Sequence, residues 1–293
     1  MATAADWLEG ARLRTLPAAV APVIAGSAVA LHYGGFHLVR AQLAFVVALA
    51  LQVGVNFAND YSDGIRGTDS ATHRVGPQRL VGSGAASPEQ VRTAAFASFG
   101  VAALAGLTLV VLTGAWFLLP VGAAAVAAAW FYTGGRRPYG YLGLGEVFVF
   151  VFFGLVAAVG TTYVQLLRAP EAAWWAGVAT GAFACAILVA NNLRDVAGDT
   201  RVGKRTLAVR LGDRRTRWLY VGLVFLGLFG FFQVAASTTW WGLVALLAAV
   251  AVVGPVRLVL DGALGGQLIR VLKLTGIAEL AGAVLLYAGL WLG

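Results

Sequence analysis

Residues 93–135, TAAFASFGVAALAGLTLVVLTGAWFLLPVGAAAVAAAWFYTGG, contain no charged side chain. A single helix of this length would extend for about 65 Å, roughly twice the thickness of the hydrocarbon core of a bilayer. The stretch therefore predicts two consecutive membrane-spanning helices, and the polar pair Thr113-Gly114 near its middle predicts the turn between them.

The composition of the whole chain supports a membrane protein. Of its 293 residues, 60% are hydrophobic and 12% are charged, and the mean hydropathy is +0.82. Soluble domains carry about 25% charged residues, so this class is excluded. The single cysteine, Cys185, excludes an intramolecular disulfide scaffold. The 38 glycines suit transmembrane helices that pack closely through small residues.

Further charge-poor stretches raise the predicted number of spans to nine. Residues 218–256 again require two helices, with a break near Ser237-Thr238-Thr239. The other five spans are predicted at residues 15–39, 41–59, 147–167, 172–193 and 274–293. With no linker in sight, we expect residues 1–293 to form one all-α polytopic membrane bundle of about nine transmembrane helices around a central cavity.

The distribution of basic residues predicts the orientation of this bundle. Nineteen of the 21 lysines and arginines fall in the N-terminal segment and the even-numbered loops. The positive-inside rule then places the N-terminus and these loops in the cytoplasm, as in a multi-pass protein of the cell membrane. The net charge of +8 is thus interpreted as a topology signal, and no nucleic-acid partner is expected.

A cluster of polar residues follows the second predicted span. Asn56, Asn59, Asp60 and Asp63 are spaced i, i+3, i+4 and i+7, so on a helix they form one stripe. Asp69 follows six residues later. A polar helix end at the headgroup level is a common structural feature, and this cluster by itself does not decide between a cap and a site.

A second cluster follows the sixth predicted span at the same face of the membrane. Asn191, Asp195 and Asp199 are spaced i, i+4 and i+8, again on one helix face. Hard oxygen ligands at two facing positions suit Mg²⁺, which binds one or two carboxylates together with substrate phosphates. Arginines and lysines adjoin both clusters and suit the phosphates. The two clusters together predict a metal–diphosphate site.

At these clusters the chain resembles the UbiA-type superfamily of intramembrane prenyltransferases, and in particular its MenA branch, the 1,4-dihydroxy-2-naphthoate polyprenyltransferases. The similarity covers residues 12–212. It is carried by RLRTLP (12–17), NDYSDGIRGTD (59–69), YTGG (132–135), YGYLGLGE (139–146), NNLRD (191–195) and GKRTLAVRLG (203–212).

The resemblance implies a reaction and a set of site residues. A polyprenyl group would pass from its diphosphate to 1,4-dihydroxy-2-naphthoate with loss of CO₂, assisted by Mg²⁺, with Mn²⁺ as the alternative ion. Asp60, Asp63, Asp195 and Asp199 would be catalytic and would hold the metal together with Asn56, Asn59, Asp69 and Asn191. The expected substrate contacts are Arg66, Arg79, Tyr132, Arg136, Tyr139, Asn192, Lys204 and Arg205.

One position departs from the superfamily pattern. Many members have Tyr-x-x-x-Lys where this chain has Tyr132 followed by Arg136. An arginine keeps the positive charge but does not give up its proton, so Arg136 is expected to contact phosphate at most.

Other functions compete with this interpretation. Other aromatic acceptors, such as 4-hydroxybenzoate, homogentisate, chlorophyll or haem precursors, are used within the superfamily. A CDP-alcohol phosphatidyltransferase would place all four acids in one segment, whereas here 132 residues separate Asp63 from Asp195. A transporter or channel would favour polar, broken helices near the membrane midplane, whereas nearly all the acids here lie at one surface.

Overall fold

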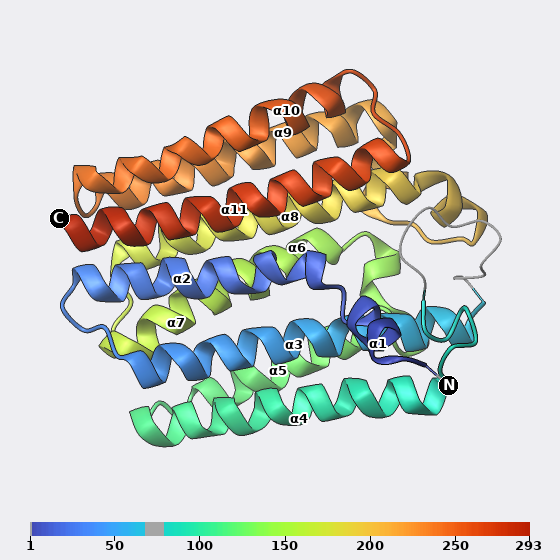
Figure 1. Cartoon of the computed structure of the whole chain (residues 1–293), viewed down its shortest axis with the longest axis horizontal. Coiled ribbons are helices and arrows are strands. Elements are labelled where there is room, and N and C mark those ends of the chain that lie inside the picture. The colour runs from blue at the N-terminus through green and yellow to red at the C-terminus, as the bar shows by residue number, and fades with distance from the viewer. Residues whose placement is uncertain (1, 68–78) are drawn as a thin grey trace.

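The described part of the chain, residues 2–67 and 79–293 of a computed structural model, contains helices and no strand. The helices run side by side along the long axis of the molecule (Figure 1). Their bounds are α1 Ala4–Gly10, η1 Leu13–Thr15, α2 Leu16–His32, α3 Leu38–Ile65, α4 Pro88–Thr113, α5 Leu118–Phe131, η2 Tyr139–Leu142, α6 Gly145–Val149, η3 Phe150–Val156, α7 Ala157–Leu166, α8 Glu171–Arg201, α9 Leu207–Ala236, η4 Trp240–Leu247, α10 Ala248–Leu260 and α11 Gly266–Leu292.

These elements confirm the predicted all-α bundle of about nine spans. Within the described residues, eight helical segments are long and apolar enough to cross a membrane, and the shorter apolar helix α5 is the ninth candidate. Both predicted breaks are present. Helix α4 ends at Thr113, where Gly114 takes a left-handed conformation with φ 69°. Helix α9 ends at Ala236, and the next helical segment starts at Trp240.

Two helices continue beyond the predicted apolar spans. Helix α3 extends to Ile65 instead of Asn59, and α8 extends to Arg201 instead of Leu193. The 28 residues of α3 span about 42 Å, which exceeds the hydrocarbon thickness. The polar stripes therefore lie on continuous helical turns at one end of the bundle, rather than in loops.

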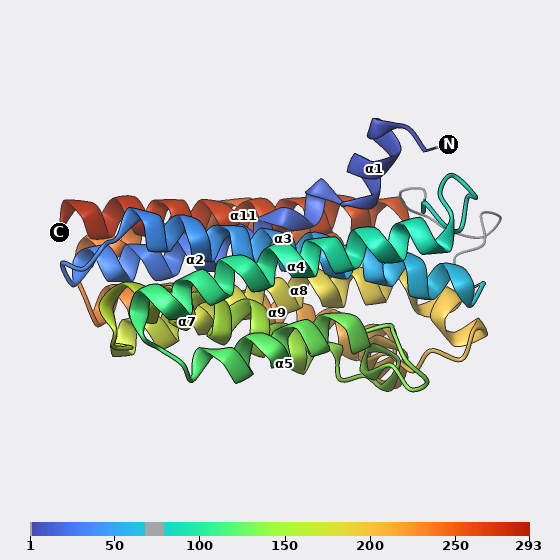
Figure 2. The same cartoon turned by 90° about the horizontal axis from the view of Figure 1, so that it is seen from below.

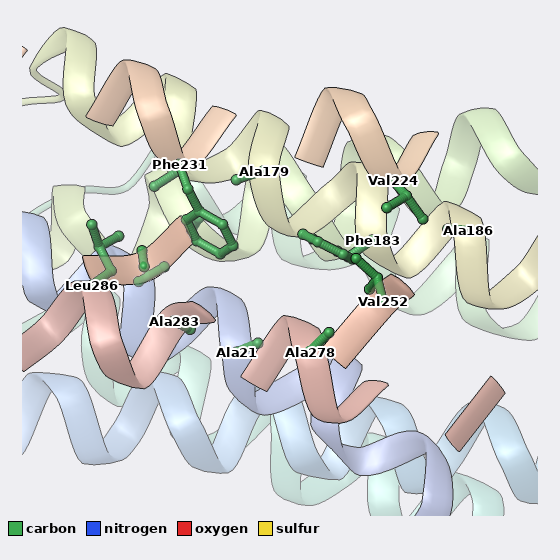
Figure 3. Packing of buried hydrophobic residues seen from close by; sticks show 14 of the residues in the cluster. Ala21, Ala179, Phe183, Ala186, Val224, Phe231, Val252, Ala278, Ala283 and Leu286 are labelled. Carbon is green, nitrogen blue, oxygen red and sulfur yellow. The ribbon is translucent and has the colours of Figure 1, made fainter. Parts of the chain in front are cut away.

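In the view of Figure 1, α8 and α11 lie between α9 and α10 on one side and α2 on the other, whereas Figure 2 shows that α11 runs along one edge of the bundle. Their main core contains the fully buried Phe183, Phe231 and Leu286 (Figure 3). Small residues permit this close packing: a Cβ at Gly230 would lie 2.7 Å from the backbone nitrogen of Ala179. This core fixes α8, and with it one of the two polar stripes.

The fifth span is helical throughout but changes its helix type. It starts as α6, passes through a π-helical turn at η3, and returns to α-helix in α7. At the π-helical turn, Gly154 lies against α8, where an added Cβ would come within 2.6 Å of both Gly177 and Gly181. The absence of side chains at these positions lets the turn sit directly on α8.

Candidate active site

A large cavity of about 1080 Å³ penetrates the bundle and connects the two polar stripes. The C-terminal ends of α3 and α8 supply its polar end. Apolar residues of α2, α3, α5 and the fifth span supply most of its depth, among them Val23, Val47, Val121 and Val156. Its volume reaches the upper end of the range for small-molecule pockets, so it can hold a ligand with a polar head and a long apolar part.

Asn59 and Asp63 of the first stripe face this cavity from adjacent turns of α3. The side-chain oxygen of Asn59 accepts a hydrogen bond of 2.7 Å from Thr133. One oxygen of Asp63 accepts hydrogen bonds of 2.6 Å from the Tyr141 hydroxyl and 3.3 Å from Lys204 Nζ. Two loops far apart in the sequence thus meet at Asp63.

Asp60 lies away from the cavity. Its side chain is fully buried and is not part of the cavity lining. Its two oxygens accept hydrogen bonds of 2.9 and 3.0 Å from the backbone N–H groups of Leu80 and Val81. On α3 the two side chains point only about 60° apart, and Asp60 reaches the backbone of Leu80 and Val81 while Asp63 faces the cavity. Asp60 therefore anchors this segment, and its placement does not support a role as a metal ligand.

Asn56 has a mainly structural set of partners. It borders the cavity, but its amide nitrogen donates to the Ala11 carbonyl at 2.9 Å and to the Thr15 hydroxyl at 3.0 Å. Asn56 thereby ties the N-terminal segment to α3, and a metal contact of its side-chain oxygen stays a prediction. Asp69, also predicted as a ligand, lies outside the described residues.

The second stripe lies on α8, and Asn191, Asp195 and Asp199 all face the cavity. Arg194 donates two hydrogen bonds, of 2.7 and 2.8 Å, to the Asp195 carboxylate, and a third, of 2.8 Å, to the side-chain oxygen of Asn191. The two contacts with the guanidinium group fix the orientation of the Asp195 carboxylate. The structure thus brings Asp63 of the first stripe and three polar residues of the second to one end of one cavity.

The predicted substrate contacts divide into two groups. Those that line the cavity are Arg79, Tyr132, Tyr139, Asn192 and Lys204, whereas Arg66, Arg136 and Arg205 do not line it. Arg66 donates instead to the carbonyls of Thr133 and Gly135, and so supports the loop after α5. The backbone N–H of Arg205 donates to the Tyr141 carbonyl at 3.0 Å.

The electrostatic surroundings of Lys204 favour its charged form. Burial lowers the pKa of Lys204, but the Asp63 carboxylate, the Tyr141 hydroxyl and Asp199 together outweigh burial and raise that pKa above its ordinary value. Burial, and then the Asp63 charge, raise the pKa of the Tyr141 hydroxyl. At neutral pH the site therefore holds a lysine cation and a neutral tyrosine donor around Asp63.

Sequence reasoning missed several groups of this site. Tyr141 and Thr133 bind the first stripe, Arg194 binds the second, and Glu146 accepts a hydrogen bond of 2.9 Å from the Asn192 side chain. Each lies inside a quoted motif, yet no spacing rule links Tyr141 to a carboxylate 78 residues away. Arg12, Arg14 and Lys273 also line the cavity.

The donor set fits a hard cation only in the company of a diphosphate. Among residues 2–67 and 79–293, no three histidine, cysteine, aspartate or glutamate side chains form one metal-binding group. The available donors are carboxylate and amide oxygens from two helices, which is the chemistry that Mg²⁺ prefers. Since Mg²⁺ commonly completes its shell with water and substrate phosphates, an incomplete protein ligand set is suitable.

Comparison with known proteins identifies the family. The pattern of the UbiA prenyltransferase family matches residues 19–264. The chain belongs to the UbiA prenyltransferase family. Within it, the chain is 52% identical to a 1,4-dihydroxy-2-naphthoate octaprenyltransferase of Mycobacterium tuberculosis, over 100% of this chain and 99% of the relative. It is 39% identical to the protein of the same name from Escherichia coli, over 87% and 84% of the two chains.

Solved structures of UbiA homologs share the fold. The apo structure of a UbiA homolog from Aeropyrum pernix K1 superposes with a TM-score of 0.69, at 15% identity, over 93% of this chain and 96% of that one. A UbiA homolog from Archaeoglobus fulgidus bound to DMAPP and Mg²⁺ gives a TM-score of 0.58, at 14% identity, over 96% and 99%. With its apolar helices, this UbiA family member is a multi-pass membrane protein.

Proposed function

We propose that the protein transfers a polyprenyl group from its diphosphate to 1,4-dihydroxy-2-naphthoate, with loss of CO₂, in menaquinone biosynthesis. One observation carries the proposal: two acidic helix ends and several cations meet at the polar end of a deep apolar cavity. This arrangement suits a ligand with a diphosphate head and an isoprenoid tail. The acceptor is inferred from the full-length similarity to enzymes named for that substrate.

The polar end is suited to ionising an allylic diphosphate. Mg²⁺, when held by Asp63, Asp195, Asp199 and Asn59, supplies positive charge to the diphosphate oxygens. Lys204 and Arg79 line the same end and add counter-charge as the C–O bond breaks and its electron pair leaves with the diphosphate. The Asp63–Lys204 and Asp195–Arg194 pairs hold these charges in position before the substrate arrives.

The apolar depth of the cavity protects the resulting allylic cation from water. Carbon–carbon bond formation uses an electron pair of the electron-rich naphthoate ring. Release of CO₂ then returns the electron pair of the broken C–C bond to the ring and restores its aromaticity. No covalent intermediate with a protein nucleophile is required. The apolar part of the cavity is lined mainly by alanine, valine, leucine and aromatic side chains.

We also propose that the polar end of the cavity faces the cytoplasm in the cell membrane. The proposal rests on the 19 basic residues of the N-terminal segment and even-numbered loops. A water-soluble acceptor and the released diphosphate would then enter and leave on that side, while the polyprenyl tail stays at the level of the lipid.

An assay with defined substrates tests the activity. Purified protein in lipid vesicles is given octaprenyl diphosphate and Mg²⁺ with 1,4-dihydroxy-2-naphthoate, or with 4-hydroxybenzoate or homogentisate in parallel. We expect a prenylated product from the naphthoate alone. In mass spectrometry it should be lighter by one CO₂ than the prenylated naphthoate that keeps its carboxylate. A product from another acceptor and none from the naphthoate would contradict the assignment.

A further inference from the structure

Four aromatic side chains form a continuous wall below the polar end of the cavity. They are Tyr132 at the end of α5, Tyr139 in η2, Phe148 in α6 and Phe152 in η3, and all four line the cavity. Tyr139 and Phe148 stack with ring centroids 4.0 Å apart and planes 24° from parallel. Tyr132 meets Tyr139 edge-on at 5.5 Å, and Phe152 continues the stack 6.2 Å from Phe148.

This aromatic wall begins beside the acidic site. Tyr132 lines the cavity together with Asp63 and Asp199. Its ring lies against the backbone of the following loop, where a Cβ at Gly145 would be 3.2 Å from Cε2 of Tyr132. Tyr139 is fixed by its hydroxyl, which donates to the Ala128 carbonyl at 2.8 Å. The wall is thus anchored next to the place where a diphosphate would leave.

The depth of each ring follows from the register between the fifth span and α8. The hydrogen bond between Glu146 and Asn192 places these residues at one level. Phe148 lies two residues deeper than Glu146, about 3 Å of helix rise, and Phe152 lies six residues deeper, about 9 Å. Asp195 lies three residues from Asn192 toward the polar end, about 4.5 Å. Along the helix axes, Phe148 therefore lies about 7.5 Å from Asp195, toward the apolar end of the cavity. Phe152 lies about one helical turn farther from the acids.

The π-helical turn explains how the fifth span keeps this face on the cavity. Its cavity-lining positions recur as pairs every four residues: 148 and 149, 152 and 153, 156 and 157. In a regular α-helix, each four-residue step rotates the face by about 40°. The wider turn at Phe150–Val156 reduces this drift, and π-helical turns are common at functional sites.

We propose that Phe148, supported by its stacking on Tyr139, is a catalytic residue that stabilises the allylic cation through its π-electrons. The inference deepens the proposed function and rests on it. When the C–O bond breaks, the electron pair leaves with the diphosphate and positive charge spreads over the allylic carbons. The unactivated phenyl ring of phenylalanine attracts such a cation but is a far weaker nucleophile than the dihydroxy-substituted ring of the acceptor, and cation–π attraction is strongest away from water. The charge disappears when the ring of the acceptor forms the new C–C bond.

Progressive fluorination of one ring tests this inference. Each added fluorine weakens the negative potential of the ring face and changes its size little. Phenylalanine carrying one, two or three fluorines is placed at position 148 of the full-length protein, and the single-turnover rates of diphosphate release and of acceptor prenylation are measured together. We expect both rates to fall stepwise, by about 100-fold over the series, with log rate linear in the cation-binding strength of the ring.

Position 152 is the matched control, because Phe152 lines the same cavity one turn deeper. The same series there should change the rates less than about threefold. A flat series at position 148, or equal falls at both positions, would overturn the inference. A wild-type protein that releases no diphosphate and prenylates no naphthoate would instead contradict the proposed function, so the two failures are distinguishable.

Discussion

Asp60 and Asp63 lie three residues apart on α3 and have different surroundings. Asp63 faces the cavity and contacts Lys204 and Tyr141, whereas Asp60 binds two backbone amides after residue 79. The sequence places both acids on one stripe. Four residues spaced i, i+3, i+4 and i+7 cover an arc of about 100° of the helix surface, so side chains at different places on the stripe can face different neighbours. Only the path of the following loop, which the spacing does not encode, separates the two roles.

The cavity-facing acids should be essential for turnover. Asp63→Asn, Asp195→Asn and Asp199→Asn each keep the side-chain size but remove a charge that acts on the leaving diphosphate. Each should lower the prenylation rate at least about 100-fold, or about 2.7 kcal/mol. Asp261→Asn is the control, because Asp261 is an exposed acid in the turn before α11. Near wild-type rates in all three folded variants would contradict their assignment.

Asp60→Asn should act through the loop. An amide side chain offers one acceptor oxygen, so one of the N–H groups of Leu80 and Val81 loses its partner, at a cost of about 1–3 kcal/mol. Hydrogen exchange at these two amides should accelerate about tenfold or more in Asp60→Asn. In Asp63→Asn the same amides should exchange as in the wild type. Unchanged exchange in Asp60→Asn would show that the carboxylate does not anchor this segment.

At the scale of elements, the fifth span shows what its hydrophobicity pattern could and could not predict. A charge-free run from 147 to 167 predicts one helix, and the described segment from Gly145 to Leu166 agrees with it. The π-helical turn inside it depends on contact with α8 through Gly154, Gly177 and Gly181. Such a contact between distant segments leaves no periodic signal in the span itself. The aromatic wall was therefore missed, although Tyr132 and Tyr139 were predicted as substrate contacts.

Gly154→Ala should destabilise the protein through this contact. The added methyl group would meet the Gly177 carbonyl oxygen at 2.5 Å and the Gly181 Cα at 2.6 Å, so the two helices must separate. Overpacking of this kind costs about 1–3 kcal/mol, and we expect the Tm in detergent to fall by several degrees. Gly222→Ala in α9 is the matched control. It has open space around it, so its Tm should stay the same or rise. An unchanged Tm in Gly154→Ala would contradict the close packing.

For the whole molecule, the approximate number of spans and the two breaks within the long apolar stretches could be predicted from the sequence. Charge-free length is set by the bilayer, so it is visible without any tertiary information. The ends of α3 and α8 could not be placed, because their last turns are polar and depend on contacts such as Thr133 with Asn59. The same holds for the site. Both polar stripes could be predicted from the spacing of their residues, whereas their hydrogen-bond partners from other segments, such as Thr133 and Tyr141, could not.

The orientation of the bundle can be tested on a single helix. Glu171 and Thr200 lie near opposite ends of α8, and both are exposed. In a Cys185→Ala background, Thr200→Cys should react with a membrane-impermeant maleimide only after the cytoplasmic side is opened. Glu171→Cys should react in intact cells, because the positive-inside rule places it outside. The reverse pattern would invert the proposed topology.

In the proposed function, α3 and α8 together hold one diphosphate across the cavity. Binding of a non-hydrolysable polyprenyl diphosphate analogue to the purified protein tests it most directly, because neither the acceptor nor turnover is involved. With Mg²⁺ present, titration calorimetry should show one site. Asp63→Asn and Asp199→Asn should each raise its Kd at least about tenfold, or about 1.4 kcal/mol, and excess chelator should do the same to the wild type. Wild-type affinity in either variant would show that its helix does not hold the diphosphate, and would contradict the claim.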